Sequence, residues 1–169
     1  RGLVGEAFGV APGDDDFISL RDEFLDRYAL RLTNETCVFE HVNLLLDALD
    51  AQTVPWGIVT NKAIRYAEPV TRALGLYDRA AAVIGGDSTP HSKPHPEPLL
   101  EAARRMQIDP GRCLYVGDDA RDVQAGRAAG MLTVAVTWGY LGLGEPIEAW
   151  GAHHTINNAM DILQLLRMA

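Results

Sequence analysis

Three carboxylates lie close together directly after a short apolar run. Asp118, Asp119 and Asp122 follow residues 114–116, which are typical of a buried strand, and Gly117, which lets the backbone turn sharply. Carboxylates this close repel one another unless a cation lies among them or one of them takes up a proton. Helix capping explains one or two of these aspartates but not three. The segment therefore favours a Mg²⁺ site over capping alone.

Two further polar segments lie next to an expected strand or helix. Thr60 and Asn61 come after the apolar residues 57–59, and a hydroxyl with free backbone N–H groups suits a bound phosphate. Ordinary N-capping explains this pair equally well. Lys93 lies in the proline-rich run 92–98, at the expected start of a helix, where its charge opposes the helix dipole. An anion would explain that placement, and a common exposed lysine is the alternative.

Taken together, the three segments are more specific than any one of them. In chain order they provide a hydroxyl at Thr60, an ammonium at Lys93 and carboxylates from Asp118 onward. Ligands of parallel α/β sheets gather beyond the carboxyl ends of the strands. A carboxylate-bound Mg²⁺ would bridge to phosphate oxygens while Lys93 and Thr60 hold the others. The combination predicts a phosphoryl-transfer site.

A histidine pair is the weaker candidate for a metal site. His91 and His95 are four residues apart, the spacing that places two side chains on one face of a helix. Pro94 and Pro96 block that helix, so we do not expect these histidines to bind a metal together.

The elements that must position these residues form an α/β pattern. From residue 56, short β-branched runs alternate with helices, which predicts a doubly wound, Rossmann-like parallel sheet. Two amphipathic helices precede it, over 14–32 and 41–51. We expect a partial helical cap over residues 1–50 and an α/β core over 51–169. The expected strands are 57–60, 81–84, 114–116, 132–136 and 155–156, and the later helices include 97–106 and one through 162–166.

Composition limits the possible partners and compartments. The 169 residues suffice for one full core, with 47% hydrophobic and 22% charged residues. A net charge of −8 argues against a nucleic-acid partner, and no apolar run is long enough to span a membrane. Cys37 and Cys113 have no spacing that indicates a disulfide framework or zinc site. Without a visible signal peptide, we expect a cytoplasmic protein.

Three motifs resemble those of a known enzyme family. Ile58-Val-Thr-Asn-Lys62, Ser92-Lys-Pro-His-Pro-Glu-Pro98 and Val116-Gly-Asp-Asp-Ala-Arg-Asp122 resemble the second, third and fourth motifs of haloacid dehalogenase-type phosphatases. The chain is similar to bacterial phosphoglycolate phosphatases, and it is particularly similar to the branch that includes N-acetylmuramic acid 6-phosphate phosphatase. The residues that carry this closer similarity are Trp56-Gly-Ile-Val-Thr-Asn-Lys62 and Arg65-Tyr-Ala-Glu-Pro69.

The resemblance implies a role for each phosphate-binding residue and for the cofactor. By it, Thr60 and Asn61 bind the phosphate and Lys93 stabilises its charge. The cofactor would be Mg²⁺, with Asp118 as its first ligand. The family's reaction is attack by an aspartate on phosphorus, followed by hydrolysis of the aspartyl-phosphate with help from a second aspartate.

For the other two carboxylates of the acidic loop, the resemblance implies a role that is less specific. Asp122 would orient Lys93 or the metal shell. Asp119 could contribute to either role, and we count it with Asp118 as a candidate metal ligand.

The chain departs from the family at the first motif. That motif, Asp-x-Asp, follows an N-terminal strand, whereas the aspartates at 14–16 precede a helix, so we reject them as the nucleophile. By the family's layout, the absent strand lies mid-sheet, between the strands that lead to Thr60 and Asp118. We expect roughly 60 further residues before this chain in the natural protein. The chain alone should then be inactive.

The leading prediction is a Mg²⁺-dependent phosphatase acting on a small phosphorylated metabolite of the phosphoglycolate or N-acetylmuramic acid 6-phosphate type. A β-phosphoglucomutase-like phosphotransferase and a non-catalytic phosphate-binding module are the alternatives. The sequence does not fix the exact substrate, because the cap that would select it carries no fixed motif. It also leaves the oligomeric state open, a homodimer included.

Overall fold

The structure is a computed structural model of the 169-residue chain, and it describes residues 2–139, 141 and 144–167. The chain forms two compact units, Arg1–Thr36 and Cys37–Ala169. Each unit has its own packing, and the candidate site residues at 60, 61, 93, 118, 119 and 122 all belong to the larger one.

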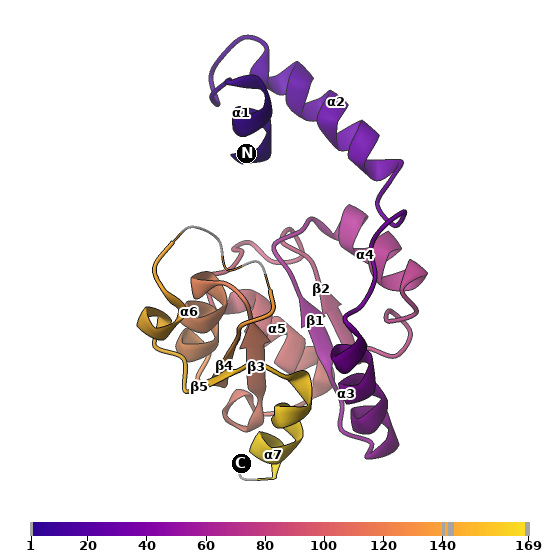
Figure 1. The fold of residues 1–169 in the computed structure, drawn as a ribbon, viewed down its shortest axis with the longest axis vertical. Helices are drawn as coiled ribbons and strands as arrows, with labels where there is room; N and C mark the ends of the chain where they lie inside the picture. Colours follow the sequence, from indigo (N-terminus) through magenta and orange to yellow (C-terminus); the bar gives the residue numbers. More distant parts are fainter. Residues whose placement is uncertain (1, 140, 142–143, 168–169) are drawn as a thin grey trace. The chain divides into compact units, whose positions relative to one another are not determined.

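The smaller unit is a pair of helices, α1 (Gly2–Phe8) and α2 (Phe17–Ala29) (Figure 1). Phe17 is buried at the start of α2, and the rings of Phe24 and Tyr28 stack with centroids 6.2 Å apart. This spacing of four residues places both rings on one face of the helix. The segment before α2 forms turns rather than a strand. This agrees with the expectation that the aspartates at 14–16 do not follow a strand and are not the nucleophile.

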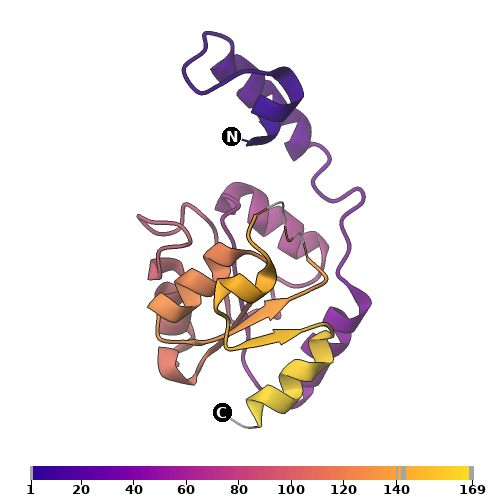
Figure 2. The same ribbon diagram turned by 60° about the vertical axis from the view of Figure 1, so that its left-hand side comes forward.

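The larger unit contains two parallel sheets, and Figures 1 and 2 show their strands and helices. One sheet pairs two strands, and the other has three in the order β3-β4-β5. Parallel neighbours need long crossovers, and helices supply them here. The strands are β1 (Gly57–Val59), β2 (Ala82–Ile84), β3 (Leu114–Gly117), β4 (Leu132–Val136) and β5 (His154–Ile156). The helices are α3 (Glu40–Ala51), α4 (Ile64–Ala73), α5 (Glu97–Met106), α6 (Ala120–Ala128) and α7 (Ile162–Leu166), with short 3₁₀ helices at Pro110–Arg112, Ile147–Trp150 and Ala159–Asp161.

Alternating side chains of β3 pack into two different apolar clusters. Tyr115 packs with the cluster that includes Leu99 of α5 and Ala125 of α6. Leu114 and Val116 pack with the cluster formed by α3, α7 and the preceding 3₁₀ helix. Successive strand residues point to opposite faces. Helices therefore cover both faces of the sheet, and the predicted doubly wound α/β class is confirmed.

The predicted bounds agree with the structure for some helices and strands and differ for others. The helix expected over 97–106 and the strand expected over 132–136 match α5 and β4. The helix expected over 14–32 is shorter at both ends, because Asp14 and its neighbours form turns before α2 and residues 30–33 form turns after it.

The division between units falls before α3, whereas the sequence analysis places the domain boundary after it, between residues 50 and 51. Leu45 and Leu49 of α3 are buried against Ala159 and Ile162 near the carboxyl end of the chain. The amphipathic pattern indicates a helix with a face to bury, but it does not say which partner buries that face. The role of residues 1–50 as a partial helical cap remains a prediction.

A gap in the sheet separates β1 from β3. Neither strand pairs with the other, and an apolar cavity of about 640 Å³ extends along them. Ile58 and Leu114 are among the residues that line it, with Leu45 of α3. The interruption lies where the sequence analysis expects a further strand. Among the residues that the structure describes, no helix is long and apolar enough to cross a membrane.

Close packing of α6 on the sheet gives a test of the fold. A Cβ atom added at Gly126 would lie 2.5 Å from the Cγ2 methyl of Thr133, which is buried in β4. We expect Gly126→Ala to lower the free energy of unfolding by about 1–2 kcal/mol, because overlap in a packed core outweighs the gain in helix propensity. Urea denaturation measures this change. Gln124→Ala, on the exposed side of α6, should stay within about 0.5 kcal/mol, and an equal loss at both positions would contradict the packing argument.

Candidate active site

A buried ammonium group lies at the centre of the candidate site. Lys93 Nζ contacts Asp122 Oδ1 at 2.7 Å and donates to Val59 O at 2.9 Å and to the Tyr115 hydroxyl at 2.9 Å. The Lys93 and Asp122 side chains are only 10% and 9% exposed. The contacts join the end of β1, the loop before α5, β3 and the first turn of α6. They bring the predicted Lys93 and Asp122 together.

Asn61 holds the loop that carries Lys93. Its side-chain amide donates to the backbone oxygen of Lys93 at 2.9 Å, and its Oδ1 accepts from the Lys93 N–H at 3.0 Å. Thr60, between Asn61 and the Val59 carbonyl, accepts a hydrogen bond from Lys62 N–H at 3.1 Å. The structure therefore places the three residues predicted to hold phosphate around one strand end.

Tyr115 is a site residue that the sequence analysis missed. Its hydroxyl lies 3.3 Å from Val59 O and 3.4 Å from Asp122 Oδ1, in addition to the contact with Lys93. Burial, followed by the charge and hydrogen bond of Asp122, raises the pKa of this phenol well above its ordinary value. The available signal was a hydroxyl-bearing residue in an otherwise apolar strand, because a buried tyrosine hydroxyl needs a partner.

The three carboxylates of the acidic loop have separate surroundings. Asp122 pairs with Lys93, whereas Asp119 is the N-cap of α6 and accepts from the Arg121 N–H at 2.8 Å. Asp119 also binds the Arg121 guanidinium at 2.6 Å. These bonds lower the pKa of the Asp119 carboxyl, against the opposing effect of burial. Capping therefore describes Asp119, and its predicted role as a metal ligand remains a prediction.

Asp118 lies half-buried directly after β3. A Cβ atom at Gly139, beyond the end of β4, would overlap the Asp118 carboxylate, and one at Gly117 would overlap that of Asp122. Both glycines are thus positions where the backbone approaches a carboxylate closely. Larger residues there would displace the two acids.

The donor set around Asp118 fits Mg²⁺ in one particular manner. Mg²⁺ takes oxygen ligands and usually keeps several waters, with one or two carboxylates and a substrate phosphate completing its shell. In the described part of the chain, Asp118, Asp119 and Asp122 do not form a group whose oxygens converge on one position. A site built on Asp118, with waters and phosphate oxygens, agrees with this arrangement, whereas an all-protein cage does not.

The fold and the arrangement of these residues define a class of protein. A family model described as haloacid dehalogenase-like hydrolase matches residues 8–130, most of the chain. The chain belongs to this family, and the resemblance of its three motifs is confirmed.

Two phosphatases and one solved structure are similar to this chain over most of its length. Over all 169 residues, the chain is 38% identical to an N-acetylmuramic acid 6-phosphate phosphatase of Pseudomonas putida and covers 76% of it. It is 44% identical to a phosphoglycolate phosphatase of Xylella fastidiosa over 130 residues, which are 77% of this chain and 57% of that protein. The crystal structure of a predicted phosphoglycolate phosphatase from Haemophilus somnus superimposes with a TM-score of 0.85 at 28% identity, covering 97% of this chain and 72% of that one.

The buried ion pair gives a stability prediction. Asp122→Asn leaves the Lys93 ammonium buried without its counter-charge, so we expect a loss of about 3–5 kcal/mol in the free energy of unfolding. Adding Lys93→Met should recover part of that loss. Urea denaturation of the single and double variants measures the coupling. As a control, Glu68→Gln removes a carboxylate from a pair with Arg72 that is 39% and 49% exposed, and should cost less than about 1 kcal/mol. Additive losses at 93 and 122 would rule out the pair.

The raised pKa of Tyr115 predicts a change in the free energy of unfolding at alkaline pH. A phenol whose pKa is raised on folding contributes stability below its unfolded value, near 10.0, and this contribution is lost as the pH rises through the folded value. Between about pH 9 and pH 11, Tyr115→Phe should therefore lose less stability than the wild type. Denaturant unfolding at several pH values measures the slope. Tyr77→Phe changes no hydroxyl beside Lys93 and should keep the wild-type slope; identical slopes in all three proteins would contradict the assignment.

Proposed function

We propose that this chain is the larger part of a Mg²⁺-dependent phosphatase that hydrolyses a small phosphomonoester of the phosphoglycolate or N-acetylmuramic acid 6-phosphate type. The observation that carries the proposal is the buried Lys93–Asp122 pair at the strand end that also bears Thr60 and Asn61. The named relatives, which are phosphatases of these two types, support the substrate class.

Lys93 would stabilise the phosphate mainly through its charge. An ammonium has three N–H groups, and Asp122, Val59 O and the Tyr115 hydroxyl are three acceptors already in place. A phosphate oxygen must replace one of these contacts to bind Nζ directly. The Asp122 carboxylate is the contact that would cost most to exchange, because only this acceptor is charged, so the phosphate oxygen would displace the Val59 carbonyl or the Tyr115 hydroxyl. Thr60 and Asn61 would provide uncharged donors.

Asp118 is the residue that would hold Mg²⁺, and Asp119 is the second candidate. Mg²⁺ supplies neutralisation of the charge on the transferring phosphoryl group. Asp119 would have to exchange a bond with Arg121 in order to take part. Asp122 has a different function, since it fixes the position of Lys93.

The nucleophile would be an aspartate on a strand that fills the cavity between β1 and β3. The unpaired edges of these two strands and their apolar surroundings support that placement. A carboxylate oxygen of this aspartate would form a bond to phosphorus as the ester P–O bond breaks, and the leaving alkoxide oxygen would take a proton from the second aspartate of the same motif. Water then hydrolyses the aspartyl-phosphate to inorganic phosphate and the free carboxylate.

Phosphatase assays of the protein produced from its complete reading frame test this proposal. With Mg²⁺ present, we expect release of phosphate from phosphoglycolate or N-acetylmuramic acid 6-phosphate. Asp118→Asn should lower kcat/KM at least 100-fold, because it weakens the metal shell. Residues 1–169 alone should be inactive. Release of phosphate by this chain alone, or equal activity in excess chelator, would contradict the mechanism, and an intact natural protein that starts at Arg1 would contradict the additional strand.

A matched variant separates loss of chemistry from loss of structure. Glu68→Gln also converts a carboxylate to an amide, but on the exposed face of α4, and should keep wild-type activity. Transfer of phosphate to a hexose phosphate in place of water would favour the phosphotransferase alternative.

A further inference from the structure

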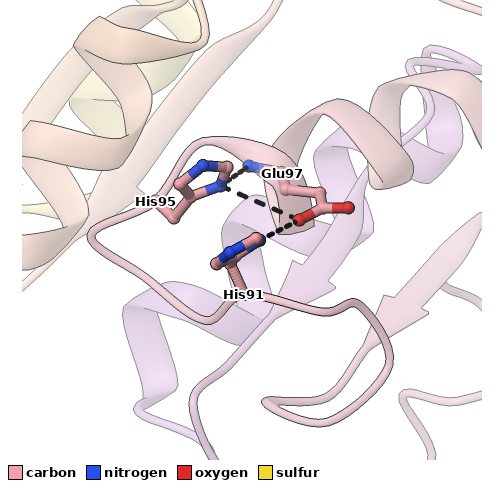
Figure 3. Close-up of side chains that lie close together, drawn as sticks. All are labelled: His91, His95 and Glu97. Atoms are coloured by element: carbon pink, nitrogen blue, oxygen red, sulfur yellow. Dashed lines mark hydrogen bonds and ion pairs between the residues drawn. The ribbon is translucent and has the colours of Figure 1, made fainter.

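The loop before α5 brings two imidazoles and a carboxylate together outside the candidate active site. Figure 3 shows His91 and His95 on this loop and Glu97 at the start of the helix, with their polar atoms facing one another. In the described part of the chain, these three residues are the group whose possible ligand atoms all lie close together, within 4.8 Å.

The two histidines lie close together although prolines prevent a helix between them. Residues 91–96 are not helical, as Pro94 and Pro96 require. The loop nevertheless turns back, so that the two imidazole rings stack with centroids 4.3 Å apart and planes inclined by 26°. The expectation that His91 and His95 cannot act together rested on helical spacing alone, and a turn achieves the same proximity.

The distances suit a small, nitrogen-preferring cation. Glu97 Oε2 lies 2.8 Å from His91 Nδ1 and 3.8 Å from His95 Nδ1. Ligands at Zn–N and Zn–O distances near 2.1 Å in a tetrahedral shell are separated by about 3.4 Å, a value between these two. The two imidazole rings stack, so they must also turn about their side-chain bonds before both nitrogens can point at one ion. Their exposure on a loop leaves room for this movement.

We propose that His91, His95 and Glu97 form a binding site for a first-row transition-metal ion of the Zn²⁺ type. Two neutral imidazoles and one carboxylate are a ligand set that selects Zn²⁺, Co²⁺ or Ni²⁺ over Mg²⁺, which prefers oxygen ligands. The side chains are 62%, 50% and 36% exposed, so the ion can enter from solvent and water can complete its shell.

The present hydrogen bonds show how the ion would enter. His95 Nδ1 accepts from the Glu97 N–H at 3.2 Å, so this nitrogen carries no proton and has a lone pair to offer. The ion would replace that long hydrogen bond with a coordinate bond. The ion would also take the place of the hydrogen bond between His91 Nδ1 and Glu97 Oε2. Because imidazole binds a metal only in its neutral form, metal binding should weaken as the pH falls.

Calorimetric titration with Zn²⁺ of the protein produced from its complete reading frame tests the proposal, and it needs no catalytic activity. We expect one site per chain that saturating Mg²⁺ does not block. His91→Ala and His95→Ala should each weaken binding at least tenfold. Two variants are matched controls: His154→Ala removes an exposed histidine elsewhere, and Asp118→Asn alters the acidic loop. Both should bind Zn²⁺ like the wild type.

A spectroscopic measurement keeps the assignment testable if a variant is poorly folded. Co²⁺ bound to the wild-type chain should show the visible absorption of a four-coordinate ion, and Zn²⁺ should abolish it. The same absorption should be lost in Glu97→Gln while its circular dichroism remains that of the wild type. No binding by the wild type, or equal binding by His91→Ala, His95→Ala and the wild type, would overturn the proposal. Failure of the phosphatase assay would leave this result unchanged, because the two experiments examine different residues.

Discussion

A buried positive charge needs a negative partner, and in this protein that requirement connects the parts of the site. Removing an ammonium and a carboxylate from water costs several kcal/mol for each ion unless close contact and further hydrogen bonds compensate. Lys93 obtains this compensation from Asp122, from the Val59 carbonyl and from Tyr115. These contacts come from three stretches of chain that are remote in sequence, at Val59, at Lys93 and from Tyr115 to Asp122. The pair can therefore form only when both sheets and the α5 loop are in place.

The same requirement constrains the backbone around the pair. Gly117 lies so close to the Asp122 carboxylate that a side chain there would displace it. On the other side, the paired hydrogen bonds of Asn61 with the Lys93 backbone hold the loop at the end of β1. The charge of Lys93, which we propose acts on phosphate, is thus held by contacts that also stabilise the fold. Stability and the proposed function depend on the same few residues.

The acidic loop shows how far a local pattern can be interpreted. Three aspartates in five positions suggest one shared cation, yet Asp122 pairs with Lys93 and Asp119 binds Arg121, while Asp118 is the residue proposed to hold Mg²⁺. Two protein cations, Lys93 and Arg121, reduce the repulsion among these acids. The number of carboxylates was evident in the sequence. Which cation each carboxylate binds was not, because that depends on how the side chains of Lys93 and Arg121 are oriented in the folded protein.

The sequence by itself determined the order of helices and strands, the α/β class and the segments that carry Thr60, Lys93 and Asp118. Hydrophobic periodicity and turn residues act over a few positions, so they can be recognised without a partner. The tertiary structure alone decided that Tyr115 joins the site, that α3 packs with the end of the chain and that His91 meets His95 and Glu97. Each of these depends on where a loop turns or which surface a face meets, and that is fixed only when distant segments pack together.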